Sequence, residues 1–213
     1  MEKKERDEVT TMKFAITPGF GVGGTVFTPE QLSTLGAVVG DNARIELTTF
    51  KQLYVEVEET HYHEIAQKLS AVGLEIHPAG FYTKSLITCN FCRGEAEAGL
   101  KTAKLLDAAI SAKAVPSPLK IGYAGCALGT SEPLLKDIGV VKMLDKFDIY
   151  IGGESKGLKA STAQLFVSGL SEEDMISVIQ RLVKNFQEHG KKKEKYSKFI
   201  ERYSLDALRK LIA

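Results

Sequence analysis

The stretch Leu119-Lys120-Ile121-Gly122-Tyr123-Ala124-Gly125-Cys126 joins a short apolar run to a glycine loop that ends in a cysteine. The apolar run predicts a β-strand that leads into this loop. A second cysteine segment lies upstream, at Thr88-Cys89-Asn90-Phe91-Cys92-Arg93-Gly94, and the chain has 3 cysteines in all. Such a set of thiols can serve metal or iron–sulfur chemistry. A fourth thiol is expected at position 130, where Thr130 supplies a hydroxyl instead.

The composition is that of a soluble globular protein, with 213 residues, 44% hydrophobic and 26% charged. A net charge of +1 gives no indication of nucleic acid or an anionic membrane surface as a partner. No apolar run approaches the roughly 20 residues that span a bilayer, and the charged start, Met1–Asp7, has no apolar signal core. The low and odd number of cysteines argues against a disulfide framework. We therefore expect a cytoplasmic protein.

The sequence predicts an α+β fold with a charged lead-in at 1–11, a first domain at 12–79 and a second at 80–213. In the first domain, Thr28, Pro29 and Gln31 mark a helix start. His61 and His63 are two positions apart and are expected on the surface. The other expected elements are a strand at Met12–Thr17, one long strand or a hairpin over Ile45–Val57, a helix at about Tyr62–Val72 and a strand at Leu74–His77.

The second domain has more glycine and lysine and holds all the cysteines. Ser171 is expected to cap a long helix that ends near His189. The other expected elements are a helix over Gly94–Lys113, a strand at Leu119–Tyr123, a short helix at Pro133–Asp137, strands at Val140–Val141 and Phe147–Ile151, and a last helix at Ser204–Ile212.

The residues alone leave the chemistry of the thiols open. They could be inert buried groups, a thioredoxin-like dithiol, or a zinc site in which His77 is the only nearby fourth ligand. An iron–sulfur cluster needs thiolates on turns without intruding side chains, which Gly94, Gly125 and Gly129 would provide. The helix after Cys92 would also direct its positive N-terminal end at an anionic cluster.

Longer motifs resemble the siroheme-dependent nitrite and sulfite reductases over nearly the whole chain after residue 12. The similar segments are Lys120–Cys126 continuing through Ser131–Val141, the glycine turn Asp148–Gly153, the C-terminal signature Phe199–Leu205, and Thr28–Val57 with Leu47-Thr48-Thr49 at its centre. The resemblance implies a ferredoxin-like half-domain followed by an α+β domain that holds a [4Fe-4S] cluster and siroheme.

The chain departs from the family at the cluster itself. The family pattern is C-x5-C followed by C-x3-C, and its last cysteine bridges the cluster to the siroheme iron. Cys92 and Cys126 match the second and third positions, Cys89 lies too close to Cys92 for the first, and Thr130 replaces the bridge. The resemblance therefore implies a cluster on Cys89, Cys92 and Cys126 with an open or different fourth ligand, or a site that has lost part of its cofactor.

The resemblance also implies roles for basic residues and for a glycine turn. Lys120 and Lys51 are the candidate catalytic residues, because the family binds its anionic substrate with Lys and Arg. The candidate siroheme-binding residues are Thr130, Gly152, Gly153, Lys156 and Lys159.

The implied reaction transfers electrons through the cluster to siroheme-bound sulfite or nitrite, from a donor such as a ferredoxin. The alternative is a non-catalytic relative that binds cofactors or carries electrons after losing the bridging cysteine. The family's enzymes contain two such repeats and this chain resembles one, so a homodimer is expected.

Overall fold

The computed structural model describes residues 10–41, 43–158 and 160–212. These residues divide into two compact units, one with residues 10–19 and 27–79 and the other with residues 20–26 and 80–212. The segment 20–26, which the sequence places in the domain 12–79, packs in the second unit. There, the backbone N–H of Gly23 donates to the carbonyl of Asn90 at 2.8 Å. Within the described ranges, no helix is both long and apolar enough to cross a membrane.

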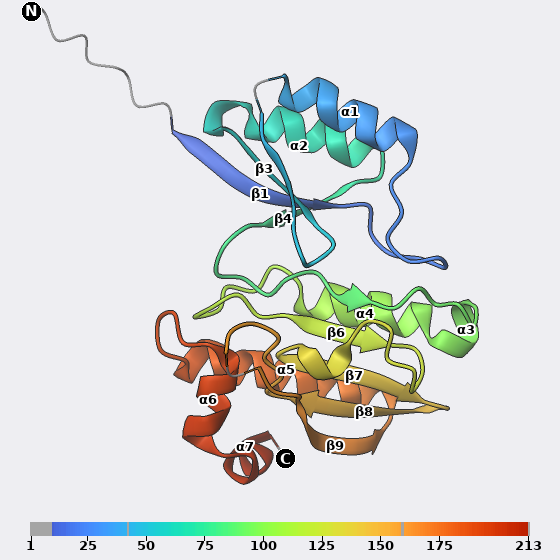
Figure 1. Cartoon of the computed structure of the whole chain (residues 1–213), viewed down its shortest axis with the longest axis vertical. Helices are drawn as coiled ribbons and strands as arrows, with labels where there is room; N and C mark the ends of the chain where they lie inside the picture. Colours follow the sequence, from blue (N-terminus) through green and yellow to red (C-terminus); the bar gives the residue numbers. More distant parts are fainter. Residues whose placement is uncertain (1–9, 42, 159, 213) are drawn as a thin grey trace, which may run out of the picture. The chain divides into compact units, whose positions relative to one another are not determined.

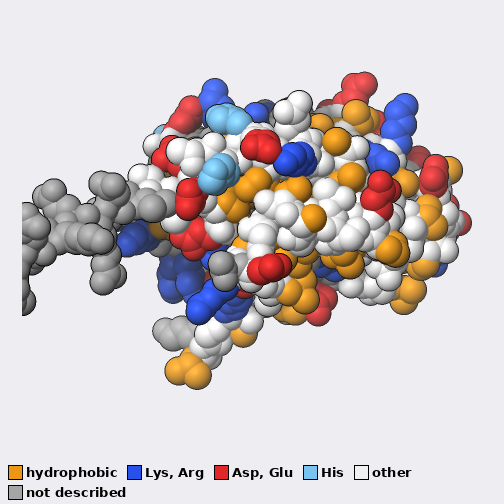
Figure 2. Space-filling view, turned by 90° about the horizontal axis from the view of Figure 1, so that it is seen from above, with side chains coloured by type: hydrophobic (Ala, Val, Ile, Leu, Met, Phe, Trp, Pro, Cys, Tyr) orange, Lys and Arg blue, Asp and Glu red, His pale blue; other side chains and the backbone are white. Residues whose placement is uncertain are grey.

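The first unit is a four-stranded antiparallel sheet of order β2-β3-β1-β4, with two helices on one face (Figure 1). Its elements are β1 (Thr11–Thr17), α1 (Pro29–Val39), β2 (Ile45–Leu47), β3 (Leu53–Glu58), the short 3-10 turn η1 (Glu59–His61), α2 (Tyr62–Ala71) and β4 (Glu75–Pro78). The register of Ile45 with Val55 confirms a hairpin rather than one long strand. His61 and His63 are exposed, and Figure 2 shows His side chains on the surface beside Asp and Glu.

The start of α1 confirms the predicted capping. The hydroxyl of Thr28 accepts a hydrogen bond from the backbone N–H of Gln31 at 3.1 Å. The side chain of Gln31 in turn accepts from the N–H of Thr28 at 3.0 Å and donates to the carbonyl of Val72 at 3.1 Å. The cap thereby ties the start of α1 to the end of α2.

The second unit is a five-stranded mixed sheet of order β5-β6-β7-β8-β9. Strands β5, β6 and β7 are parallel, and β7, β8 and β9 are antiparallel. The strands are β5 (Ile87–Thr88), β6 (Ile121–Ala124), β7 (Ile138–Met143), β8 (Lys146–Ile151) and β9 (Gln164–Leu170). The helical elements are α3 (Glu95–Ala98), α4 (Leu100–Ile110), the 3-10 turn η2 (Pro133–Leu135), α5 (Glu172–His189), α6 (Tyr196–Tyr203) and α7 (Leu205–Ile212). Ser171 caps α5 as predicted, accepting from the N–H of Asp174 at 3.1 Å.

The single helix predicted over Gly94–Lys113 is wrong, because the chain breaks at Gly99 into α3 and α4. Gly99 has φ +70°, a left-handed conformation that ends α3. A Cβ at this position would collide with the hydroxyl of Tyr123. That hydroxyl donates to the carbonyl of Ala98 at 3.0 Å. The break therefore gives a buried tyrosine its hydrogen-bond partner.

We predict that Thr28→Ala lowers the free energy of unfolding by about 1 kcal/mol, because the N–H of Gln31 loses its partner. Urea unfolding followed by circular dichroism measures the change. Thr28→Ser is the matched control and should stay close to the wild type, since serine keeps the hydroxyl. Equal destabilisation by both substitutions would contradict the role of the cap.

Candidate functional site

Parallel strands β5 and β6 bring two cysteines to one edge of the sheet. Thr88 pairs with Tyr123, so Cys89 and Cys126 both follow the carboxyl ends of neighbouring strands. The backbone N–H of Cys89 donates to the carbonyl of Tyr123 at 3.1 Å, which continues the ladder. The backbone N–H of Gly125 donates to the sulfur of Cys89 at 3.3 Å. Backbone and sulfur contacts therefore link the two cysteine loops at the sheet edge.

Cys92 lies on the turn between β5 and α3 and is exposed. The turn is held by Phe91, which has φ +50° and is fully buried. The ring of Phe91 stacks on Phe20 and Tyr123, with centroid distances of 6.0 and 6.1 Å. This buried aromatic ring anchors the turn and leaves the thiol of Cys92 at the surface.

Cys126 is partly exposed and lines a pocket of about 270 Å³ together with Arg93 and Glu97. The guanidinium of Arg93 donates to Glu97 at 2.9 Å. This hydrogen bond, and then the nearby charges of Cys126 and Cys92, raise the pKa of Arg93. Arg93 is therefore a cation placed near both thiols.

The thiols match an iron–sulfur cluster in donor chemistry but fall short of a complete ligand set. A Cβ on Gly125 would lie 2.6 Å from the carbonyl of Ala98, so glycine is required beside Cys126. The described ranges contain no group of three or more His, Cys, Asp or Glu side chains that could hold a metal ion. His77, the fourth ligand of the zinc alternative, belongs to the first unit and faces Glu75 at 3.4 Å.

Thr130 is exposed at the end of the loop that begins with Cys126. Within the loop, the N–H of Gly129 donates to the carbonyl of Cys126 at 3.2 Å. The next residue, Ser131, is buried and donates its hydroxyl to the carbonyl of Tyr123 at 2.7 Å. The loop is therefore folded back on β6, and Thr130 presents a hydroxyl at its surface.

Lys120 and Gly152 lie on either side of the buried residue Asp137. The backbone N–H of Lys120 donates to the Asp137 carboxylate at 2.7 Å, and the N–H of Gly152 donates to the Asp137 carbonyl at 2.9 Å. Burial raises the pKa of Asp137 to about 6, although the ammonium of Lys120 opposes the rise. Two predicted site residues are thus joined by Asp137, one through its carboxylate and one through its carbonyl, and the sequence analysis missed this residue.

Gly153 packs against the backbone of the η2 turn. A Cβ at this position would collide with the carbonyl of Lys136 and would lie 2.6 Å from that of Leu134. Gly152 has φ +87°, a left-handed conformation that favours glycine. The two glycines therefore let the end of β8 approach η2 closely.

The remaining predicted lysines lie in different surroundings. Lys156 is exposed, and its backbone N–H donates to Glu154 at 3.2 Å. Lys159 lies outside the described residues. Lys51 is exposed on the turn between β2 and β3 in the first unit, with φ +58°.

The sequence analysis also missed Lys84, a lysine that is only 2% exposed. Its ammonium donates to the carbonyl of Gly80 at 3.0 Å, and burial lowers its pKa to about 8. Its backbone N–H donates to the carbonyl of Leu119 at 2.9 Å, next to Lys120. A single lysine in the sequence gives no sign that it is buried, so the sequence offered no signal for this residue.

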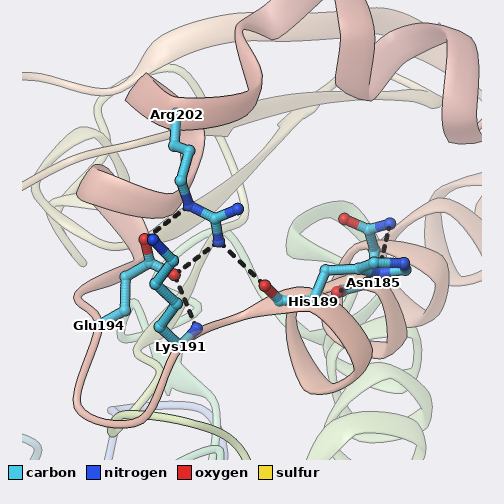
Figure 3. Close-up of polar contacts among 5 residues, drawn as sticks. All are labelled: Asn185, His189, Lys191, Glu194 and Arg202. Atoms are coloured by element: carbon cyan, nitrogen blue, oxygen red, sulfur yellow. Dashed lines mark hydrogen bonds and ion pairs between the residues drawn. The ribbon is translucent and has the colours of Figure 1, made fainter.

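A clamped loop borders the Asp137 region. The guanidinium of Arg202 donates to both carboxylate oxygens of Glu194, at 3.0 and 2.8 Å, and to the carbonyl of His189 at 2.9 Å (Figure 3). The backbone N–H of Lys191 also donates to Glu194, at 2.8 Å. The clamp fixes the loop before α6, from which Lys195 pairs with Glu154 at 3.1 Å.

The family described as "Nitrite and sulphite reductase 4Fe-4S domain" matches residues 83–213. The chain is 28% identical over 190 residues to a cobalt-factor III methyltransferase of Priestia megaterium, covering 88% of this chain and 34% of that protein. It is 22% identical over 219 residues to an assimilatory-type sulfite reductase of Nitratidesulfovibrio vulgaris, covering 98% of this chain and 94% of that protein. The chain thus spans about a third of the methyltransferase and nearly all of the reductase.

Two solved structures share the fold. Dissimilatory sulfite reductase I (DsrI) superposes with a TM-score of 0.71 at 12% identity, over 95% of this chain and 68% of that one. The NirA protein of Mycobacterium tuberculosis superposes with a TM-score of 0.60 at 19% identity, over 97% of this chain and 42% of that one. These likenesses confirm the α+β fold.

We predict that Gly153→Ala destabilises the protein by about 2 kcal/mol, since the added Cβ collides with the backbone of η2. Gly21→Ala is the matched control, because nothing lies within 4 Å of a Cβ there. Thermal denaturation of both variants measures the difference. A wild-type melting temperature for Gly153→Ala would contradict the close approach.

Proposed function

Because the chain belongs to the nitrite and sulphite reductase 4Fe-4S domain family, we propose that it binds an iron–sulfur cluster and siroheme and passes electrons to bound sulfite or nitrite. The observation that carries the proposal is the parallel pairing of β5 with β6, which brings Cys89 and Cys126 to one sheet edge. The family match begins at residue 83 and includes both strands.

In this proposal, Cys89, Cys92 and Cys126 hold a [4Fe-4S] cluster, which when bound supplies single electrons. The amide of Gly125, which donates to the sulfur of Cys89 at 3.3 Å, would help to position this sulfur as a ligand. Arg93 would offset the negative charge of a cluster at Cys92 and Cys126.

We assign the anionic groups to basic residues and to the glycine turn. Lys120 would bind the sulfite or nitrite anion through its ammonium group. Lys156 and Lys159 would bind siroheme carboxylates beside Gly152 and Gly153. Lys51 is retained as a second anion ligand on the resemblance alone. A ferredoxin-like donor and a homodimer complete the proposal, and light scattering tests the dimer.

A second candidate function follows from Thr130. A hydroxyl is a hard ligand and cannot replace the soft thiolate that bridges the cluster and the siroheme iron in the family. In addition, one relative of this chain is named as a methyltransferase rather than a reductase, with the match covering 88% of this chain. The chain would then bind cofactors or carry electrons without reducing the anion.

The visible spectrum and iron content of the protein, purified anaerobically from a host that makes siroheme, test the first proposal. We expect siroheme bands together with about four further irons per chain. Iron without siroheme would favour the second candidate function. A colourless, iron-free protein would contradict the cofactor assignment and with it both candidates.

Single cysteine substitutions test the proposed ligands. We predict that Cys89→Ser, Cys92→Ser and Cys126→Ser each lose most of the cluster iron, because serine supplies no soft thiolate. Thr130→Ala is the control and should retain the iron if its hydroxyl is not a ligand. Full iron retention in Cys92→Ser would remove this exposed residue from the ligand set.

A further inference from the structure

Asp137 is a buried carboxylate placed between two segments of the proposed site. It is 5% exposed and lies between η2 and β7. Its side chain accepts the backbone N–H of Lys120 at 2.7 Å, and its carbonyl accepts the N–H of Gly152 at 2.9 Å. Asp137 therefore holds the backbone of Lys120, the proposed anion ligand, and that of Gly152, the first glycine of the proposed siroheme-binding turn.

Lys120, Glu154 and Lys195 act electrostatically on Asp137, and Asp137 in turn acts on Tyr196. Lys120 precedes β6 and Glu154 follows β8, while Lys195 and Tyr196 come from the start of α6. Glu154 pairs with Lys195 at 3.1 Å. The neighbouring Lys136 is directed away from Asp137, towards Glu132, at 3.2 Å. The cluster around Asp137 therefore holds two carboxylates, Asp137 and Glu154, and two ammonium groups, those of Lys120 and Lys195. The pair of Lys136 with Glu132 is not part of it.

Tyr196 and the loop that leads into α6 border the cluster. The hydroxyl of Tyr196 is buried and has no hydrogen-bond partner among the described residues. Burial and then the charge of Asp137 raise the pKa of this phenol, so it stays neutral. The clamp of Arg202 on Glu194 holds the loop that leads into α6 (Figure 3). Asp137 therefore has little solvent with which to screen its charge.

We propose that Asp137 is a positioning residue for Lys120, and that its charge state sets how strongly Lys120 binds an oxyanion. This inference rests on the proposed function, which assigns the anion to Lys120. When Asp137 is ionised, its negative charge offsets part of the positive potential of Lys120 and weakens anion binding. When Asp137 takes up a proton, the hydrogen bond to the Lys120 backbone can remain while the offset disappears.

The direction of the pH effect follows from the burial of Asp137. Burial raises the pKa of this carboxyl to about 6, so it gains its proton as the pH falls through that value. We therefore expect the affinity for an anion to rise about fivefold between about pH 7.5 and pH 5.5. Nitrite is a suitable probe, because it stays a monoanion over this range.

Calorimetric titration of the anaerobically purified holoprotein with nitrite at both pH values tests the inference. Asp137→Asn keeps an oxygen for the Lys120 N–H but has no charge, so it should bind tightly at both pH values. Glu173→Gln removes an exposed carboxylate at the start of α5 and should keep the wild-type pH dependence. A purely structural role for Asp137 would leave the pH dependence of Asp137→Asn unchanged, and that result would overturn the inference.

Infrared titration of the wild type supplies a second measurement that does not depend on a variant folding. A protonated carboxyl band, assigned with isotope-labelled aspartate, should grow as the pH falls through about 6. Its absence down to about pH 4.5 would overturn the inference. If the band titrates as expected but nitrite binds the wild type at neither pH, the anion assignment to Lys120 in the proposed function is wrong.

Discussion

The parallel pairing of β5 with β6 is the constraint on which the candidate site depends. A parallel ladder ends both strands at one edge, so the loops that carry Cys89 and Cys126 leave the sheet together. Tyr123, which pairs with Thr88 in this ladder, makes two further contacts. Its ring stacks on Phe91 at 6.1 Å, and its hydroxyl donates to the carbonyl of Ala98 at 3.0 Å. A single β6 side chain thus holds both the turn of Cys92 and the end of α3.

Local signals in the sequence predict local structure well. The caps at Thr28 and Ser171 depend on residues close together in the chain, and both are confirmed. Of the two alternatives predicted over Ile45–Val57, one long strand or a hairpin, the structure has the hairpin. The helix break at Gly99 could not be predicted, because its partner Tyr123 lies far along the sequence. Strand β9 was also missed: its burial does not alternate regularly, and two register shifts interrupt its pairing with β8.

The candidate site shows the same contrast between features that nearby residues determine and features that depend on distant contacts. The residue types of the cysteine loops could be read from the sequence, but the edge that Cys89 and Cys126 share depends on strand pairing. Asp137 and Lys84 were missed because an isolated Asp or Lys carries no sign that it is buried. Burial of these two groups shifts their pKa values towards neutrality, to about 6 and about 8. Ionisable groups with such shifts are typical of functional sites.

The central proposal is that three cysteines on these loops form one iron–sulfur site despite the hydroxyl at Thr130. X-ray absorption at the iron edge of the anaerobically purified protein tests it most directly, since it reports the ligand atoms and the neighbouring irons. The account predicts iron surrounded mainly by sulfur, with a second iron at the short distance typical of a cluster. Iron bound only by oxygen and nitrogen, without an iron neighbour, would contradict it.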